Sequence, residues 1–168
     1  MTERRPNLTE RAQKVLDLAR AAAEQFGHGA VTPIHLALAI AREGSGVAST
    51  AMRFHGIAPK DLEPDLLRAL AALPASDAAP AHLPLNEEAQ QTMTDASAEA
   101  KKLGDGHIGT EHLLLALLSH STGVPSQVFA SKGIRYPDAR ARIEWIVRTD
   151  PLNPTPFVPP RDASAGAS

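Results

Sequence analysis

Residues 108–118 read Ile-Gly-Thr-Glu-His-Leu-Leu-Leu-Ala-Leu-Leu, a helix start with a carboxylate in its first turn and an apolar run behind it. Residues 31–40, Val-Thr-Pro-Ile-His-Leu-Ala-Leu-Ala-Ile, have the same layout. The upstream run is apolar nearly all round, which is typical of a buried central helix. His35 and His112 occupy the same place in the two runs, and the offset between them is 77 residues.

The same offset pairs identical residues well beyond these two runs. The register holds without a gap over a whole unit, which composition alone does not produce, so the chain reads as one duplicated helical unit. The pairs are Leu8 with Leu85, Glu10 with Glu87, Ala12 with Ala89, Gln13 with Gln90, Ala19 with Ala96, Ala23 with Ala100, Gly27 with Gly104, Gly29 with Gly106, Gly46 with Gly123, Val47 with Val124, Gly56 with Gly133 and Ile57 with Ile134.

We predict an all-α fold in which each unit holds four helices. Thr9 and Asn86 are placed to cap the first helix of each unit, and Pro64 marks either the start of a fourth helix or a kink in it. The predicted helices span 10–26, 33–40, 47–55, 61–73, 87–103, 110–118, 125–131 and 137–147. The predicted domains are a disordered N-terminus at 1–7, repeat 1 at 8–73, a linker at 74–84, repeat 2 at 85–148 and a disordered, flexible proline-rich tail at 149–168.

Composition narrows the classes of function. The 168 residues contain no cysteine, which excludes disulfides and thiolate chemistry and agrees with a cytoplasmic protein. A net charge of −2 offers no broad cationic face, so neither nucleic acid nor a membrane is an expected partner. No secretory signal is visible, and no apolar run approaches the roughly 20 residues of a membrane span.

Two stretches resemble a known family. Leu8-Thr9-Glu10-Arg11-Ala12-Gln13-Lys14-Val15-Leu16 with the Gly-His-Gly stop at 27–29, and the segment 108–114, resemble the double Clp-N repeat. This is the N-terminal domain of the Clp/Hsp100 unfoldases, and the likeness to the ClpC branch is greatest. The resemblance covers roughly 8–148 and implies two four-helix repeats related by a pseudo-two-fold axis. It also implies a docking module that receives substrates and adaptors for an attached ATPase ring.

The chain departs from that family in two respects. It contains no Gly-x-x-x-x-Gly-Lys-Ser/Thr phosphate loop, so we expect an N-domain that stands alone, without the ATPase domains. The first repeat has Thr32, Pro33 and Ile34 where the second has Gly109-Thr110-Glu111. A pocket that needs this Thr and Glu is therefore expected only once.

The resemblance implies recognition of phosphorylated arginine by Gly109, Thr110 and Glu111. A helix N-terminus presents free N–H groups to a phosphate, and a carboxylate pairs with a guanidinium. The alternative is structural, because a Thr cap followed by a first-turn Glu is an ordinary way to start a helix.

No catalytic or metal site is predicted, and no cofactor. His35 and His112 lie beside the apolar runs and are interpreted as structural core residues, because neither neighbourhood supplies enough metal ligands. The chain has no cysteine nucleophile and no Gly-x-Ser-x-Gly elbow, so an enzyme is not expected.

By the same resemblance, a groove near the start of each first helix binds adaptors and cyclic-peptide antibiotics. The corresponding positions here are Arg5, Leu8, Gln13, Leu85 and Gln90. Arg5 and Leu85 stand where ClpC proteins of actinobacteria usually carry phenylalanines, which disfavours antibiotic binding. The alternative for the two leucines is packing at helix ends.

The predicted function is that of a non-catalytic protein- and peptide-binding module that modulates Clp-dependent proteolysis as an adaptor or decoy. Its partners would be Clp substrates, adaptors or components of the Clp unfoldase and protease. One alternative is a self-associating structural or regulatory protein that uses its tail, where residues 156–160 (Pro-Phe-Val-Pro-Pro) offer either an aromatic anchor or a solvated terminus. Another alternative is a decoy for cyclic-peptide antibiotics directed at ClpC.

Overall fold

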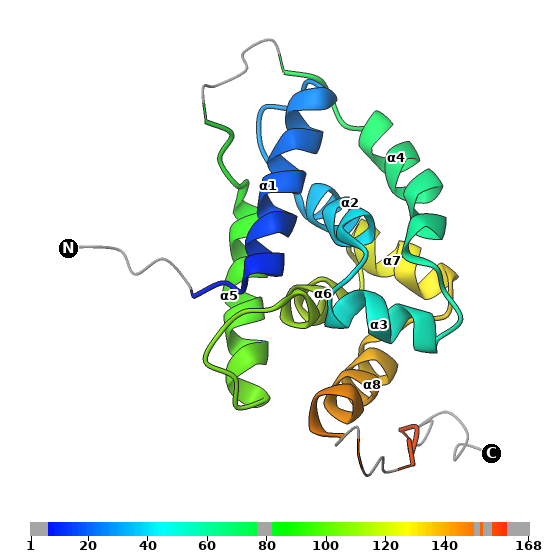
Figure 1. The fold of residues 1–168 in the computed structure, drawn as a ribbon. Helices are drawn as coiled ribbons and strands as arrows, with labels where there is room; N and C mark the ends of the chain where they lie inside the picture. The colour runs from blue at the N-terminus through cyan, green and yellow to red at the C-terminus, as the bar shows by residue number, and fades with distance from the viewer. Residues whose placement is uncertain (1–6, 77–81, 150–151, 153–155, 161–168) are drawn as a thin grey trace.

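The computed structural model describes residues 7–76, 82–149, 152 and 156–160. Regular structure in this part of the chain is helical, apart from two isolated β-bridges. Figure 1 shows the helices wrapped around a central pair, α2 and α6. Their bounds are α1 Glu10–Gln25, α2 Pro33–Glu43, α3 Val47–Phe54, a 3-10 turn Pro59–Leu62, α4 Glu63–Ala71, α5 Glu87–Lys102, α6 Thr110–Ser119, α7 Val124–Ser131 and α8 Tyr136–Arg148.

The first helix of each repeat begins at the predicted residue and ends one residue before the predicted position. The Thr9 hydroxyl accepts a hydrogen bond from the N–H of Ala12 at 3.1 Å, and the Asn86 side chain accepts one from Ala89 at 2.8 Å. Gly27 and Gly104 follow the two helices with φ of 69° and 77°, a left-handed conformation that glycine adopts at little cost. Equivalent positions in the two repeats therefore cap and terminate equivalent helices.

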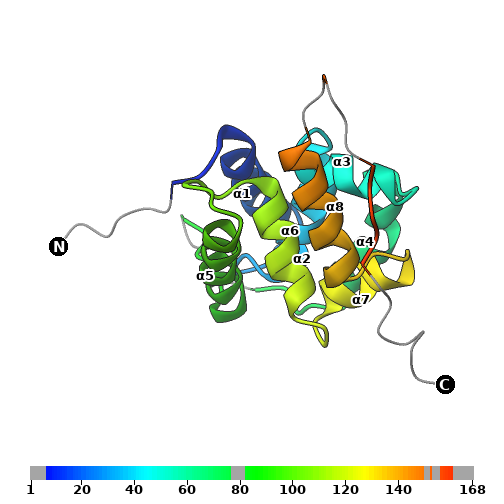
Figure 2. The ribbon, with the colours of Figure 1, turned by 90° about the horizontal axis from the view of Figure 1, so that it is seen from below.

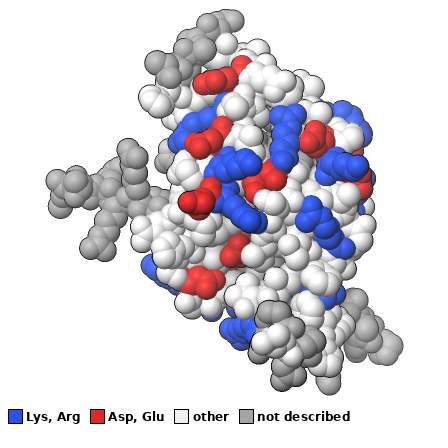
Figure 3. All heavy atoms as spheres, viewed as in Figure 1, with Lys and Arg blue, Asp and Glu red and all other residues white. Residues whose placement is uncertain are grey.

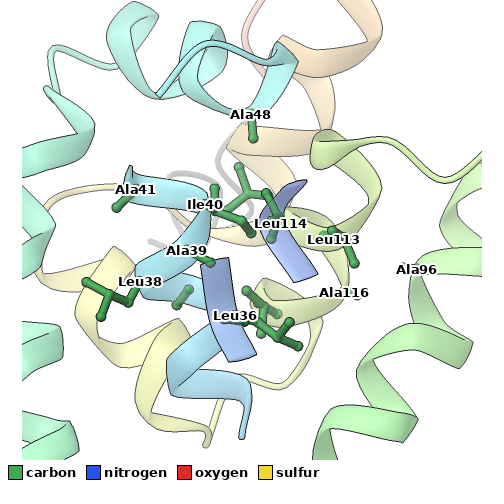
Figure 4. Close-up of a cluster of buried hydrophobic side chains, with 14 of the residues drawn as sticks. Leu36, Leu38, Ala39, Ile40, Ala41, Ala48, Ala96, Leu113, Leu114 and Ala116 are labelled. Carbon is green, nitrogen blue, oxygen red and sulfur yellow. The ribbon is translucent and has the colours of Figure 1, made fainter. Parts of the chain in front are cut away.

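The hydrophobic core lies around α2 and α6. Inside each repeat, α1 packs against α2 and α5 packs against α6. In Figure 4, Leu36 and Ile40 of α2 lie close to Leu114 and Ala116 of α6. Alanines on α1 and α5 are buried at matching positions, and their small side chains let the helices approach closely. Burying each large side chain contributes about 1.5–3 kcal/mol, so this central pair supplies much of the hydrophobic stabilisation.

Two backbone bridges tie the repeats to each other. Leu8 pairs with Ile108, and Val31 pairs with Leu85. The hydrogen bonds include Thr9 N–H to the Ile108 carbonyl at 3.0 Å and Val31 N–H to the Pro84 carbonyl at 2.8 Å. Adding the offset of 77 to positions 8 and 31 gives 85 and 108, so one bridge is the counterpart of the other. The predicted pair of four-helix repeats with pseudo-two-fold symmetry is confirmed.

Repeat 1 differs from the prediction at its fourth helix. The expected span of 61–73 divides into the 3-10 turn and α4, and Pro64 lies in the first turn of α4. Pro64 therefore starts this helix and does not kink it, because a proline in the first turn loses no intrahelical hydrogen bond. Leu83, assigned to the linker, is buried. Most of the predicted N-terminus, the middle of the linker and much of the tail lie outside the described residues.

Surface charge and helix length both bear on which partners the protein could have. Figure 3 shows acidic and basic side chains interspersed over the face seen in Figure 1. Within the described ranges, no single helix is long and apolar enough to cross a membrane. Helices α6 and α7 reach the necessary length and composition only when combined, across a bend of 99°.

Candidate functional site

The candidate site is the start of α6. Gly109 occupies the N-cap position in an extended conformation, and Thr110 is the first helical residue. The interpretation of Thr110 as the cap is therefore wrong by one position. The cap is completed by His112, whose Nδ1 accepts a hydrogen bond from the N–H of Gly109 at 2.8 Å. This arrangement leaves the N–H groups of Thr110 and Glu111 in the first turn, where a helix has no intrahelical acceptors for them.

Thr110 points into the protein. Only 2% of the residue is exposed, and its hydroxyl accepts a hydrogen bond from the N–H of Ala48 at 3.3 Å. Ala48 belongs to the first turn of α3, whose N-cap residue Gly46 has no side chain to do this. A Cβ placed on Gly46 would lie 2.3 Å from the Thr110 hydroxyl oxygen. Thr110 thus caps α3, a helix of the other repeat, and links the N-terminal ends of α3 and α6.

Glu111 folds back over the cap. A Cβ on Gly109 would lie 2.5 and 2.6 Å from the two carboxylate oxygens of Glu111, so glycine leaves the space that this carboxylate occupies. The Glu111 side chain is only 14% exposed. Among the described residues, no Lys or Arg nitrogen lies within 4.0 Å of it; its nearest ion-pair geometry is 3.9 Å to His112 Nδ1, which already accepts from Gly109. A carboxylate on a side chain that is largely shielded from water, with no cation beside it, favours a cationic ligand.

His112 is held at both nitrogens. Because Nδ1 accepts from a backbone N–H, the proton is on Nε2, which donates to Asp105 at 2.9 Å. Oxygen and nitrogen atoms of Asp105, Glu111 and His112 lie within 4.8 Å of one another, which is close enough for shared metal ligands. His112 has no free lone pair to give, however, so these three residues do not favour a bound metal. The hydrogen bonds of His112 instead fix the conformation of the start of α6.

The equivalent place in repeat 1 has different chemistry. His35 is fully buried; its Nδ1 accepts from Thr32 N–H at 2.9 Å, and its Nε2 lies 2.8 Å from His28 Nδ1. Burial, with His28 adding to it, lowers the pKa of His35 to about 4. Pro33 and Ile34 line a hollow of about 560 Å³ here. At the helix start itself Ile34 stands where its counterpart is Glu111, although the hollow is also lined by polar residues such as Glu88 and Gln91.

Leu8 and Leu85, two of the residues predicted for a partner groove, lie at the two different backbone bridges between the repeats. Leu8 is half-buried at its bridge with Ile108, next to the α6 site, and Leu85 is half-buried at its bridge with Val31. Gln13 and Gln90 are exposed; Gln13 donates to Asp17, and Gln90 donates to the Leu85 carbonyl. Arg5 lies outside the described residues.

The sequence interpretation missed the polar residues that support the site. Asp105 and His28 each stand between two glycines, seven residues before His112 and His35, so the repeat itself carried this signal.

Glu43 was also missed, although a carboxylate at the end of an apolar helix followed by Gly-Ser-Gly is unusual. It accepts hydrogen bonds from the N–H groups of Ser45 and Gly46, both at 3.1 Å, and from the Ser45 hydroxyl. Burial opposes its ionisation, but the hydrogen bonds from Ser45 and Gly46, aided by Arg11, outweigh burial and hold the pKa of Glu43 below its ordinary value. Glu43 therefore stabilises the turn that places Gly46 against Thr110.

Comparison with known proteins agrees with this architecture. A family model described as the Clp repeat (R) N-terminal domain matches residues 7–132 and 85–153. The chain is 31% identical over 135 residues to "Negative regulator of genetic competence ClpC/MecB" of Bacillus subtilis and 30% identical over 135 residues to "Chaperone protein ClpB" of Oceanobacillus iheyensis. Each match covers 80% of this chain and 16% of the relative.

Solved structures show the same fold. The Hsp104 N-terminal domain from Candida albicans superposes with a TM-score of 0.72 at 20% identity, covering 88% of this chain and 95% of that one. The ClpV N-domain in complex with a VipB peptide superposes with a TM-score of 0.63 at 14% identity, covering 86% and 96%. The matched family model and the relatives together show that the chain belongs to the Clp repeat N-terminal domain family.

Proposed function

We propose that this chain is a non-catalytic protein-binding module that receives a phosphorylated arginine side chain at the start of α6. The observation that carries the proposal is Glu111: its side chain is only 14% exposed, and no Lys or Arg in the described part of the chain pairs with it. A guanidinium group supplies the missing charge and presents paired N–H donors to a carboxylate.

The phosphoryl group would face the backbone. The N–H groups of Thr110 and Glu111 lie in the first turn of α6, and the helix dipole favours an anion there. The hydroxyl of Thr110 is engaged with Ala48, so Thr110 contributes its backbone and holds α3 in place. Gly109 contributes by leaving room for the carboxylate. One such site is proposed, because Pro33 and Ile34 replace Thr110 and Glu111 in repeat 1.

The comparisons support a docking role at a coarser level. One structural neighbour is a ClpV N-domain bound to a peptide of VipB, and several relatives are Clp chaperones or ATP-binding subunits of the Clp protease. The chain spans about a sixth of the length of the ClpC and ClpB relatives it matches, so their activities are not transferred as such. We infer a module that engages Clp substrates, adaptors or Clp components and so modulates proteolysis as an adaptor or decoy.

Titration calorimetry tests the site. A peptide with one phosphoarginine is titrated into the wild-type protein, Glu111→Gln and Glu87→Gln, with the unmodified arginine peptide as the ligand control. Glu87 is the matched control because it is an exposed first-turn glutamate of α5. Loss of a charge-assisted hydrogen bond of about 1.5–3 kcal/mol predicts binding roughly ten- to hundred-fold weaker in Glu111→Gln. Equal affinity of all three proteins would refute the assignment.

A further inference from the structure

A second cluster of side chains lies at the far end of α3 from Thr110. Phe54, the last residue of α3, is 49% exposed, and its ring lies edge-to-face against Trp145 of α8, with 5.3 Å between ring centroids. The guanidinium carbon of Arg142 lies 4.8 Å from the Phe54 ring centroid and 5.5 Å from that of Trp145. Two aromatic rings from two helices thus flank one arginine.

A segment of the tail completes this cluster. Residues 156–160, Pro-Phe-Val-Pro-Pro, run without secondary structure alongside α8, where Figure 2 shows them in red. The Phe157 ring centroid is 3.3 Å from the guanidinium carbon of Arg142 and 6.0 Å from the Trp145 ring centroid, again edge-on. Phe157 is half-buried by these contacts, whereas its neighbour Val158 is 78% exposed. Within the segment, Phe157 is thus the side chain that contacts Arg142 and Trp145.

Arg142 has no acidic partner in the part of the chain that the structure describes. No carboxylate lies within 4.0 Å of it, and its buried Nε has no hydrogen-bond acceptor among those residues. Arg142 is half-buried, and this burial lowers the pKa of its guanidinium. A weakly hydrated guanidinium of this kind is stabilised by the faces of aromatic rings.

We propose that Phe54, Arg142 and Trp145 form a second peptide-docking site, specific for an extended segment with an aromatic residue between prolines, and that residues 156–160 are its tethered ligand. The prolines hold the backbone extended, which reduces the entropy lost on docking. The guanidinium and the Trp145 ring select the aromatic side chain, so an aliphatic residue at position 157 is a poor substitute.

The covalent link between α8 and residues 156–160 favours occupancy of the site by this segment. Seven residues separate Arg148, the end of α8, from Pro156, and a short linker of this kind gives an effective concentration in the millimolar range. A free peptide of the same chemistry must displace the tail before it binds. The site is therefore regulated by the chain's own C-terminal segment.

Trp145 is the single tryptophan of the chain, so its fluorescence reports directly on this site. In the full-length protein, Phe157→Ala is expected to expose the indole and shift its emission to longer wavelength. Val158→Ala is the matched control and is expected to leave the emission unchanged. A thermal melt followed by circular dichroism checks that each variant is folded. An unchanged emission maximum in folded Phe157→Ala would overturn the proposal.

Displacement is tested with a synthetic peptide, Pro-Thr-Pro-Phe-Val-Pro-Pro-Arg, which copies residues 154–161. We expect it to restore the emission of Phe157→Ala and to require at least about ten-fold higher concentration to act on the wild-type protein. The same peptide with Ala in place of Phe should have no effect, and Arg142→Gln combined with Phe157→Ala should weaken binding. Equal action on both proteins would overturn tethered occupancy. A wild-type emission maximum that depends on protein concentration would instead assign the contact to the tail of a second copy.

Discussion

Acidification is expected to destabilise repeat 1 through His35. Its pKa is lowered from an ordinary value near 6.5 to about 4 by burial, with a contribution from His28. Between these two values the unfolded chain binds more protons than the folded one, so the free energy of unfolding falls as the pH falls. The contribution of His35 is complete above pH 6.5 and is lost as the pH approaches 4.

The magnitude follows from the same two values. A difference from 6.5 to about 4 corresponds to about 3 kcal/mol, at about 1.4 kcal/mol per pH unit. About 2 kcal/mol of this is already lost at pH 5, where the folded protein still holds His35 neutral. His35 lies inside the core with both ring nitrogens engaged, so solvent does not screen this effect.

Urea unfolding between pH 7 and pH 5 measures this loss. His35→Asn keeps an acceptor for the Thr32 N–H and removes the titrating group. We expect the difference in unfolding free energy between wild type and His35→Asn to shrink by about 2 kcal/mol over this range. The exposed His82 provides the control, because His82→Asn should follow the wild-type curve. Parallel curves for wild type and His35→Asn would refute the reasoning.

Three further predictions concern stability and site geometry. Thr110→Val should cost about 1 kcal/mol in urea unfolding, because the buried N–H of Ala48 loses its acceptor; an unchanged midpoint would show that this hydrogen bond is not stabilising. Gly109→Ala should leave the melting temperature within about 2 °C, since only the flexible end of Glu111 must move, yet weaken phosphoarginine binding in calorimetry. Leu114→Ala should cost about 2–5 kcal/mol in the same unfolding assay, since the side chain is fully buried beside α2; a loss below about 1 kcal/mol would contradict the packing shown in Figure 4.

The fold was predictable because its signals are local or repeated. Thr9 and Asn86 each accept a hydrogen bond from the N–H group three residues further along the chain. The 77-residue offset links positions that prove equivalent in space, as the bridges of Leu8 and Leu85 show. Pro64 remained ambiguous in the sequence, because its effect depends on whether the preceding residues form a 3-10 turn. Local chemistry alone does not settle that choice.

The site was predictable only in part. Glu111 stands out because Ile34 replaces it in the other repeat, but the dependence of its carboxylate position on Gly109 appears only in three dimensions. The hydrogen bond from Ala48 to Thr110 joins residues 62 positions apart, and no sequence spacing predicts it. Contacts between distant segments, such as that of Phe157 with Arg142, depend on how the helices pack and are not encoded in any one stretch.

Free phosphoarginine titrated into isotope-labelled protein, followed by backbone amide NMR, tests the central claim most directly. The account predicts shifts that saturate at the amides of Thr110 and Glu111, and at Ala48 through its hydrogen bond to Thr110, while Ile34 and His35 stay unchanged. Shifts centred on the hollow beside Ile34, or no saturable shift at the start of α6, would contradict it.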